Sequence, residues 1–416
     1  MRPALPRPFG WFAPPGYGAR NAPELPHRAL LRARRRSAAR SPKEPARLSL
    51  AHLDHVDHDH RTVRTAPHQR PEPHPTTSSA PSAQSRPRRD PYLDNAKFLA
   101  VVLVVVGHVW NNLSNLPVVE AGYLWLYLFH MPAFVLVTGY LSRRSTTVTP
   151  HRARQIVAGL VVPYLLFQAV YGVLGDVATI KSAEPGVLSP AWMMWFLAAA
   201  ACWRLTAPLW ERLRAPVAIA VPVSLVGGAT TAGVLALTQV LGLLPFFVLG
   251  LCLQPHHLTW LHSRAVRTAA GVALGAAAVA CWVVVPVTEM QVEWVLWRTS
   301  YDQLGVGWLE GGLARLGLLL AGLVLAVAFL ALVPRRPMWF TPLGAHTMYA
   351  YLLHGLVVLA ALAVGVFDLP VVQTPAGVVA TTAAAAATAW ALMTPPVRRV
   401  ARPVVAPRLR WLWRSG

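Results

Sequence analysis

Three histidines of this chain lie within long apolar segments, where an ionisable side chain is costly. His108, His130 and His354 are each surrounded mostly by Val, Leu, Ala and Phe. A charged group at the centre of a membrane costs on the order of 2.5–3.5 kcal/mol on insertion scales, so such groups usually line a cavity or a pathway. One such histidine alone is more simply a hydrogen-bond partner for a neighbouring helix. Three in one chain favour a shared site.

A lysine shares one helix face with the first of these histidines. Lys97 and His108 are eleven residues apart. In an α-helix this spacing brings the two side chains to within about 20° of each other around the axis and about 16.5 Å apart along it. A cation at the end of a span can hold a phosphorylated donor, and a deep imidazole can transfer a proton. The alternative for Lys97 is that its amine simply extends to the membrane surface.

The segments that carry these residues are typical of membrane-spanning helices. Hydrophobic residues make up 55% of the chain and charged residues 13%, with a mean hydropathy of +0.42, whereas a soluble domain has about 25% charged residues. About 20 apolar residues cross the hydrocarbon core. We therefore predict an all-α, polytopic integral membrane protein with about ten transmembrane helices. The predicted spans are 93–111, 121–141, 155–175, 190–209, 216–232, 237–254, 267–287, 311–333, 343–365 and 372–395.

The fifth and sixth of these spans have an alternative. Residues 216–254 could instead form one long span with a re-entrant piece. The loops favour ten separate spans, because arginine-rich loops alternate without a break with loops that carry few or no basic residues. Lys and Arg accumulate in cytoplasmic loops. The alternation therefore predicts a multi-pass protein with both termini in the cytoplasm. We expect the membrane to be a bacterial plasma membrane.

The first 89 residues differ in composition from the rest. They hold 17 Lys and Arg against 6 Asp and Glu, about half of the net charge of +21, and they are rich in Pro, Ser and His. Such a segment cannot bury enough apolar surface to offset its ordering entropy. We predict a disordered cytoplasmic tail over 1–89, a transmembrane domain over 90–396 and a basic cytoplasmic tail over 397–416. Because the charge follows tails and loops, it indicates membrane orientation and contact with lipid, and we expect no nucleic-acid partner.

Five segments resemble one family, the membrane-bound acyltransferase family 3, and within it the fucose 4-O-acetylase-like group. The first span resembles the family's opening helix, whose hallmark is a basic residue, ten residues and a histidine; Lys97 stands where most members have Arg. The other segments resemble its FHMP, WFL-WRL, PFF-LG and LG-YLLH stretches. The five segments are LDNAKFLAVVLVVVGHVW, LYLFHMPAFVLVTGYL, WMMWFLAAAACWRL, LPFFVLGLCL and LGAHTMYAYLLHGLV. In order, they cover roughly residues 90–395.

The resemblance implies an O-acyltransferase with acetyl-CoA as donor. An acyl group, usually acetyl, would move from cytoplasmic acyl-CoA to a hydroxyl of a glycan, glycolipid or related cell-envelope acceptor, with His108 as the essential histidine. The family also has two arginines in the second loop. Arg152 and Arg154 correspond to them, although they stand two residues apart and not three.

These roles give a hypothesis for the site. Lys97, Arg152 and Arg154 would bind CoA phosphates, and His108 would act as general base or form a transient acyl-histidine. His130 and His354 would orient His108 or stabilise the oxyanion, or else only join helices. No metal is expected, because the three cysteines have no zinc-binding spacing. The alternative functions are a transporter or lipid-linked sugar flippase and a non-catalytic membrane sensor.

The seventh loop, residues 289–310, has two interpretations. Its tryptophans, Tyr301 and acidic residues could bind a sugar, or the loop could cap the protein with its aromatic rings at the membrane interface. Arg315 in the following span could pair with an acid or line a cavity. Trp195 is one of several tryptophans near span ends, which are typical of interface anchors.

Overall fold

The computed structural model describes residues 89–113, 116–143, 147, 149–177, 186–230, 234–286 and 292–407. The tail predicted over 1–89 and the last nine residues lie outside these ranges, except for Arg89. The described residues form helices and no β-strand, which confirms the all-α fold class. The elements are α1 (Pro91–Trp110), α2 (Pro117–Ser142), α3 (Pro150–Ile156), η1 (Val157–Val161), α4 (Val162–Val177), η2 (Trp192–Met194), α5 (Trp195–Trp210), α6 (Pro216–Gly227), α7 (Leu237–Gly242), α8 (Leu244–Cys252), η3 (Pro255–Leu258), η4 (Trp260–His262), α9 (Arg264–Val284), α10 (Glu293–Leu296), α11 (Trp308–Leu332), η5 (Thr341–His346), α12 (Thr347–Ala363), η6 (Val366–Asp368), α13 (Pro375–Leu392) and α14 (Pro395–Val405).

Several helices begin where the sequence supplies a cap. Asp90 accepts a hydrogen bond from the backbone N–H of Tyr92 at 2.9 Å, and Pro91 occupies the first turn of α1, where its missing N–H costs nothing. Ser263 caps α9 in the same way, and Thr374 caps α13 ahead of a second proline. These local signals fix the starts of three apolar helices that are otherwise specified by hydrophobicity alone.

Each of the ten predicted spans contains a helix, but fewer than ten are long enough to cross a membrane. Among the described residues, seven helices have the required length and apolar character, or up to eight if the bent pair Leu237–Cys252 and Pro255–His262 is one span. The polytopic fold is thus confirmed with a smaller number of spans. In the shortest predicted span, 216–232, helix α6 has 12 residues, which is about 18 Å of helix against a hydrocarbon core of about 30 Å.

The described residues of 216–254 form a helical hairpin of α6 against α7. The hydroxyl of Ser224 on α6 donates to the carbonyl of Gly242 at 2.7 Å. A Cβ at Gly227 would lie 2.6 Å from the side chain of Leu241, which places α6 and α7 directly side by side. The chain therefore turns back after α6.

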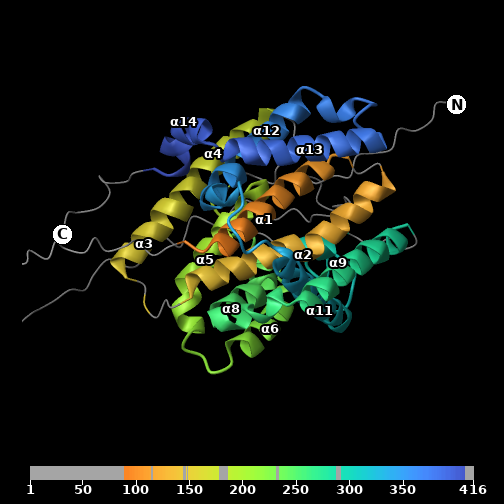
Figure 1. Ribbon diagram of the computed structural model, residues 1–416. Coiled ribbons are helices and arrows are strands. Elements are labelled where there is room, and N and C mark those ends of the chain that lie inside the picture. Colours follow the sequence, from red (N-terminus) through yellow and green to blue (C-terminus); the bar gives the residue numbers. More distant parts are fainter. Residues whose placement is uncertain are drawn as a thin grey trace, which may run out of the picture. The chain divides into compact units, whose positions relative to one another are not determined.

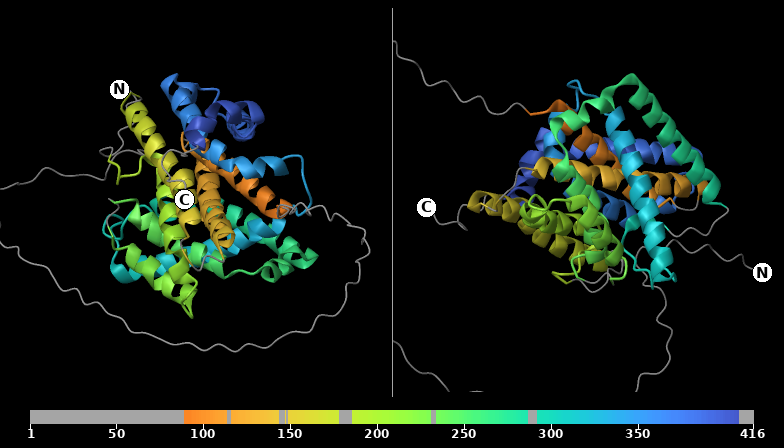
Figure 2. Two further views of the ribbon diagram at one scale, coloured as in Figure 1. Left: turned by 90° about the vertical axis from the view of Figure 1, so that its left-hand side faces the viewer. Right: turned by 90° about the horizontal axis from the view of Figure 1, so that it is seen from below.

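Helices α1 and α2 lie at the centre of the arrangement and run side by side (Figures 1 and 2). On one side α1 packs against α12 and α13, and on the other α2 packs against α8, α9 and α11. The contact of α2 with α8 is backbone to backbone. A Cβ at Gly139 would lie 2.1 Å from the carbonyl oxygen of Phe247, and one at Gly250 would lie 2.2 Å from that of Leu136. Small residues allow this close approach, as is typical of membrane helices.

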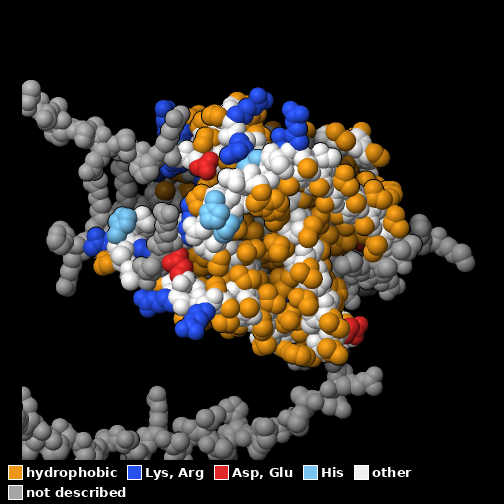
Figure 3. All heavy atoms as spheres, turned by 60° about the horizontal axis from the view of Figure 1, so that its bottom comes forward, with side chains coloured by type: hydrophobic (Ala, Val, Ile, Leu, Met, Phe, Trp, Pro, Cys, Tyr) orange, Lys and Arg blue, Asp and Glu red, His pale blue; other side chains and the backbone are white. Residues whose placement is uncertain are grey.

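Apolar side chains cover much of the outer surface (Figure 3), with Lys and Arg at its margins. On α9, Val272 and Val279 are 65% and 63% exposed, and on α11 Leu313 is 61% exposed. A soluble protein rarely exposes so extended an apolar face. These helices therefore present their outer faces to lipid, as expected of a multi-pass membrane protein.

Candidate functional site

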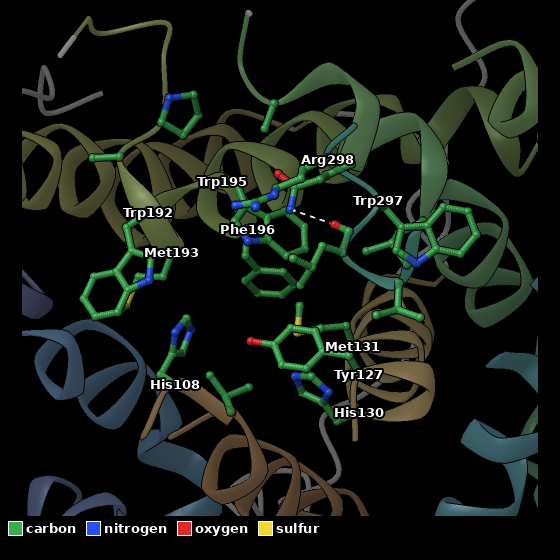
Figure 4. Close-up of a pocket in the computed structure, with 18 of the residues that line it drawn as sticks. His108, Tyr127, His130, Met131, Trp192, Met193, Trp195, Phe196, Trp297 and Arg298 are labelled. Atoms are coloured by element: carbon green, nitrogen blue, oxygen red, sulfur yellow. Dashed lines mark hydrogen bonds between the residues drawn. The ribbon is translucent and has the colours of Figure 1, made fainter. Parts of the chain in front are cut away.

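A cavity of about 340 Å³ lies beside the end of α1. Figure 4 shows His108 and Trp192 along one side of it and Tyr127 and His130 along another. The remaining walls come from the segment that precedes α5, from the turn before α7 and from the segment Val295–Arg298. Its size lies within the range of small-molecule sites, about 300–1,000 Å³. The lining is mainly aromatic and apolar, with few polar groups, as is usual for such sites.

His108 lies in the last turn of α1. Its side chain borders the cavity, and the residue is 9% exposed. The ring meets that of Trp192 edge to face with centroids 5.0 Å apart. On another side it meets the ring of His354 at 5.1 Å. His108 therefore faces a cavity.

His354 lies behind His108 and does not border the cavity. It is fully buried, and its Nδ1 is 2.8 Å from the carbonyl oxygen of Ala350. A carbonyl can only accept, so the neutral ring carries its proton on Nδ1 and has a lone pair on Nε2. That Nε2 atom has no hydrogen-bond partner among the described residues. His354 can thus accept a proton or hydrogen bond from a neighbouring group, and His108 is the ring next to it.

Hydrogen bonds to neighbouring elements fix the position of α12, the helix that carries His354. The hydroxyl of Tyr171 on α4 donates to the carbonyl of Leu352 at 2.7 Å, and the hydroxyl of Tyr351 donates to the carbonyl of Met193. Gly355 allows the close approach, because a Cβ there would lie 2.4 Å from the hydroxyl of Tyr171. These contacts hold the helix that presents His354 in a single position.

His130 borders the cavity from α2 and has the same protonation pattern as His354. Its Nδ1 is 2.8 Å from the carbonyl oxygen of Leu126, and its ring meets that of Tyr127 edge to face at 4.5 Å. The neutral ring therefore offers a lone pair on Nε2 and no donor there. This argues against the predicted role of His130 as an oxyanion donor, since a donor would need the charged ring.

Strained backbone conformations are concentrated at the cavity. Four non-glycine residues in the described ranges have a positive φ, and three of them line the cavity: Trp192 at 45°, Ala236 at 52° and Trp297 at 57°. A bulky residue in this region is strained by about 1–3 kcal/mol and persists only where its surroundings hold it. Such strain is common at binding and catalytic sites. The two tryptophans are thus held in positions that the backbone alone would not favour.

Arg315 holds the segment that closes the cavity. It is 2% exposed, and its guanidinium donates to the carbonyls of Thr299 at 3.0 Å and Ser224 at 3.5 Å. The same group lies 5.1 Å from the ring of Tyr301 and 5.5 Å from that of Trp297. Neither predicted role is met, because Arg315 forms no ion pair with a described acid and does not line the cavity. Carbonyl dipoles and aromatic faces stabilise its charge instead.

The seventh loop lies partly at the cavity and partly on the surface. Trp297 and Arg298 line the cavity, and Arg298 pairs with Glu293 at 3.3 Å. Tyr301 is buried and donates to the carbonyl of Leu225 at 2.8 Å, whereas Trp308 is 61% exposed. One part of the loop therefore borders the cavity, and the rest covers the protein. Glu289 lies outside the described residues.

Lys97 lies towards the other end of α1, as its spacing from His108 requires. Its amine forms an ion pair with Asp94 at 2.7 Å. The backbone of Asp94 is in close contact with Gly344 of η5, where a Cβ would lie 2.0 Å from the Asp94 carbonyl oxygen. Lys97, Asp94 and Arg398 all act electrostatically on His346. A group of charged side chains thus surrounds this end of α1.

Arg152 and Arg154 lie on α3, and neither lines the cavity beside His108. Arg152 donates to the carbonyl of Ser142 at 3.3 Å and interacts electrostatically with Glu211 at the end of α5. Arg154 is exposed. Of the six predicted site residues, the structure therefore brings His108, His130 and His354 together and leaves the three basic residues apart from them.

Residues that the sequence did not single out also line the cavity. Trp192 has no distinctive spacing, and Gln239 lies in a short helix where its amide donates to the carbonyl of Leu296 at 3.1 Å. Trp195, predicted as an interface anchor, lines the cavity as well. The only sequence signal for the two tryptophans was their place inside the WFL-WRL resemblance. Trp192 meets the ring of His108 although the two residues lie far apart in the sequence.

Comparison with known proteins gives one match. A family model described as the acyltransferase domain of acyltransferase family 3 matches residues 90–392. No curated protein and no solved structure matches. The matched range contains all six predicted site residues and ends just before α14. It supports the predicted acyltransferase and gives no support to a transporter or a sensor.

Proposed function

The chain belongs to acyltransferase family 3, and from this premise we propose that it transfers an acyl group, acetyl in the simplest case, from cytoplasmic acyl-CoA to a hydroxyl of a sugar or related cell-envelope acceptor. The acceptor would occupy the cavity beside His108, and the donor would arrive from the Lys97 end of α1. The resemblance to the fucose 4-O-acetylase-like group supports a sugar as acceptor.

One observation carries this proposal. His108 borders an aromatic cavity on one side and touches a second imidazole, that of His354, on the other. A general base must reach its substrate proton and have a partner that stabilises its charged form. His108 has both. A histidine that only joined helices, or that lay at the membrane interface, would not need both the cavity and the second imidazole.

In the proposed reaction, neutral His108 takes the proton of the acceptor hydroxyl as the oxygen attacks the thioester carbonyl. The carbon–sulfur bond then breaks, the acyl–oxygen bond remains, and the CoA thiolate takes the proton back from the His108 imidazolium. Atoms and charge balance without a metal or an oxidant. The alternative order, in which His108 is itself acylated first, differs in its ping-pong kinetics.

His354 would act on this reaction through His108. Its Nε2 lone pair would accept a hydrogen bond from the imidazolium that forms during the transfer, in the way that a carboxylate supports the base of a hydrolase triad. We therefore assign His354 as a positioning residue. His130 would accept a hydrogen bond from an acceptor hydroxyl through its own Nε2.

The cavity walls suit a sugar or similar polyol. Trp192, Trp195 and Trp297 offer flat apolar faces, while Gln239 and Arg298 offer polar groups at its margin. Rings that carry hydroxyls on their edges and C–H groups on their faces match such a combination. The walls come from segments on the side of the protein for which the loop charges predict an external location.

The test uses the full chain purified in nanodiscs with radiolabelled acetyl-CoA and a panel of sugar and glycolipid acceptors. We expect transfer by the unchanged protein and a loss of about 100- to 10,000-fold in His108→Ala, the usual contribution of a general base. His257→Ala is the matched control, because that histidine is exposed on η3. Transfer by His108→Ala at the control rate would exclude His108 as the base.

The acceptor arm of the experiment is independent. Trp192→Ala should weaken the apparent affinity for the acceptor, measured as KM, and leave the affinity for CoA unchanged. Trp339→Ala is its control, because Trp339 is 72% exposed and lies away from the cavity. An absence of transfer to every acceptor, together with CoA-independent movement of a labelled sugar across the bilayer, would favour the transporter alternative.

A further inference from the structure

A second and larger cavity lies at the opposite end of α1 from His108. Its volume is about 930 Å³, and it is bounded by η1, by the start of α12 and by α14. Figure 1 shows α14 beside α4 and α12. His346 lines this cavity and feels the charges of Asp94 and Lys97. The cavity therefore lies at the Lys97 end of the stripe that leads to His108.

The cavity is basic. Three arginines of α14 line it: Arg398, Arg399 and Arg402. None of the described residues that line it is acidic. Arg398 hydrogen-bonds to Nε2 of His346, and its own Nε atom is buried with no hydrogen-bond partner among the described residues. Arg399 and Arg402 are exposed. Three cations without a lining acid form a site for a polyanion.

The wall formed by η1 leaves room for a ligand. Gly159 of η1 lines the cavity, and a Cβ there would meet no atom within 4 Å. The turn that carries it, Val157–Val161, is a π-helix. Such wide turns disrupt an α-helix, are rare, and frequently occur at functional sites. The open space at Gly159 thus faces the same cavity as the arginines.

The geometry points to a site for the phosphate groups of a nucleotide-type donor, the CoA moiety of acyl-CoA, held by Arg398, Arg399 and Arg402. This inference rests on the proposed function and names a different set of ligands from the predicted Lys97, Arg152 and Arg154. The family match ends at residue 392, so α14 lies beyond the region that the match assigns.

Helix α12 connects this cavity to the imidazole pair. His346 at its start lines the basic cavity, and His354 lies eight residues further, about 12 Å along the axis. If α14 holds the phosphates of CoA, the pantetheine arm would extend along α12. Its thioester end would then reach His108. Binding the remote phosphates would position the reacting carbon, which is how binding energy away from the reaction contributes to rate.

Lipid phosphate is a second source of the same chemistry. Basic residues on a helix that follows a membrane span commonly bind anionic headgroups. The two sources differ in what the ligand requires: a nucleotide site responds to the phosphates of CoA in a neutral bilayer, whereas a lipid site responds to bilayer composition.

The experiment measures CoA binding by calorimetry to the full chain in neutral phosphatidylcholine nanodiscs. We expect Arg399→Gln/Arg402→Gln to weaken CoA binding by about 10- to 100-fold, the usual effect of losing two charge-assisted hydrogen bonds. Gly159→Leu should also weaken CoA binding, because the leucine side chain would fill part of the cavity. Arg264→Gln/Arg267→Gln is the matched control, since both arginines are exposed in the first turns of α9.

Dephospho-CoA, which lacks the 3′-phosphate, sharpens the result. The unchanged protein should bind it more weakly than CoA, and the double variant should bind the two ligands almost equally. Equal CoA affinity of the double variant and the control would overturn the inference, even if transfer activity is intact. The inference would also be overturned if the only effect of the double variant were a loss of the thermal stabilisation that anionic lipid gives the protein. CoA binding that depends on the arginines without any acyl transfer would instead count against the proposed function alone.

Discussion

The imidazole of His354 lies against that of His108, with the ring centroids 5.1 Å apart and the planes inclined at 43°. One residue ends the first span of the chain, and the other lies in the middle of α12, almost 250 residues later. Because Nδ1 of His354 donates to a carbonyl, its Nε2 carries the lone pair, and that atom has no hydrogen-bond partner among the described residues. This pair is the feature on which the proposed chemistry depends.

The first prediction concerns the acceptor role of His354. His354→Leu should lower kcat by about 10- to 100-fold, the cost of one hydrogen bond to a charged group, with little change in the KM for CoA. His354→Gln should restore part of the rate, because its amide oxygen can accept a hydrogen bond. Steady-state kinetics of both variants check this. Equal losses in both, with a raised KM, would instead indicate only a packing role.

The second prediction concerns the ion pair of Lys97 and Asp94. The carboxylate of Asp94 is almost buried, so Lys97→Met would leave it without its cation. We expect a loss of about 1–3 kcal/mol in the free energy of unfolding. Lys97→Met/Asp94→Asn should recover most of that stability.

Thermal unfolding in nanodiscs and CoA binding together separate two roles of Lys97. If Lys97 also binds the donor, the double variant regains stability but still binds CoA weakly. If its role is only the ion pair, both properties return together, and the sequence-based assignment of Lys97 to the donor site is wrong.

The third prediction concerns Arg315, which joins Thr299 and Ser224 and faces the ring of Trp297. Arg315→Met should release the segment 292–301 and raise the acceptor KM. Arg315→Lys should behave almost as badly, because a single ammonium cannot bridge two carbonyls as a planar guanidinium does. Hydrogen exchange of the amides in 292–301 is the direct measurement. Unchanged protection in Arg315→Met would show that Arg315 does not hold this segment.

The fourth prediction uses two glycines that should respond with opposite signs. Gly139→Ala forces apart α2 and α8, because its Cβ would lie 2.1 Å from a carbonyl oxygen, and we expect about 1–3 kcal/mol of destabilisation. Gly271→Ala on α9 meets open space and should stabilise its helix by about 0.5–1 kcal/mol. Urea or thermal unfolding of the two variants side by side measures both effects. Equal effects would contradict the backbone contact.

The sequence determined the elements of this protein, because crossing a membrane imposes a simple local condition on length and hydrophobicity. Each predicted span contains a helix, and the stripe of Lys97 and His108 followed from the helical repeat alone. The same local condition led us to predict too many membrane spans. A 12-residue α6 is apolar enough to suggest a span, but its sequence continues into a turn that only its packing against α7 reveals.

Only the tertiary structure decided which side chains share a site. The approach of Trp192 to His108, the positive φ of Trp297 and the basic cavity formed by α14 all depend on contacts between segments far apart in the chain. Hydrophobic periodicity shows which face of a helix is apolar, but in a membrane lipid and protein neighbours are equally apolar. Which helices meet is then set by close packing of small residues such as Gly139 and Gly250 and by a few hydrogen bonds, neither of which leaves a periodic pattern in the sequence.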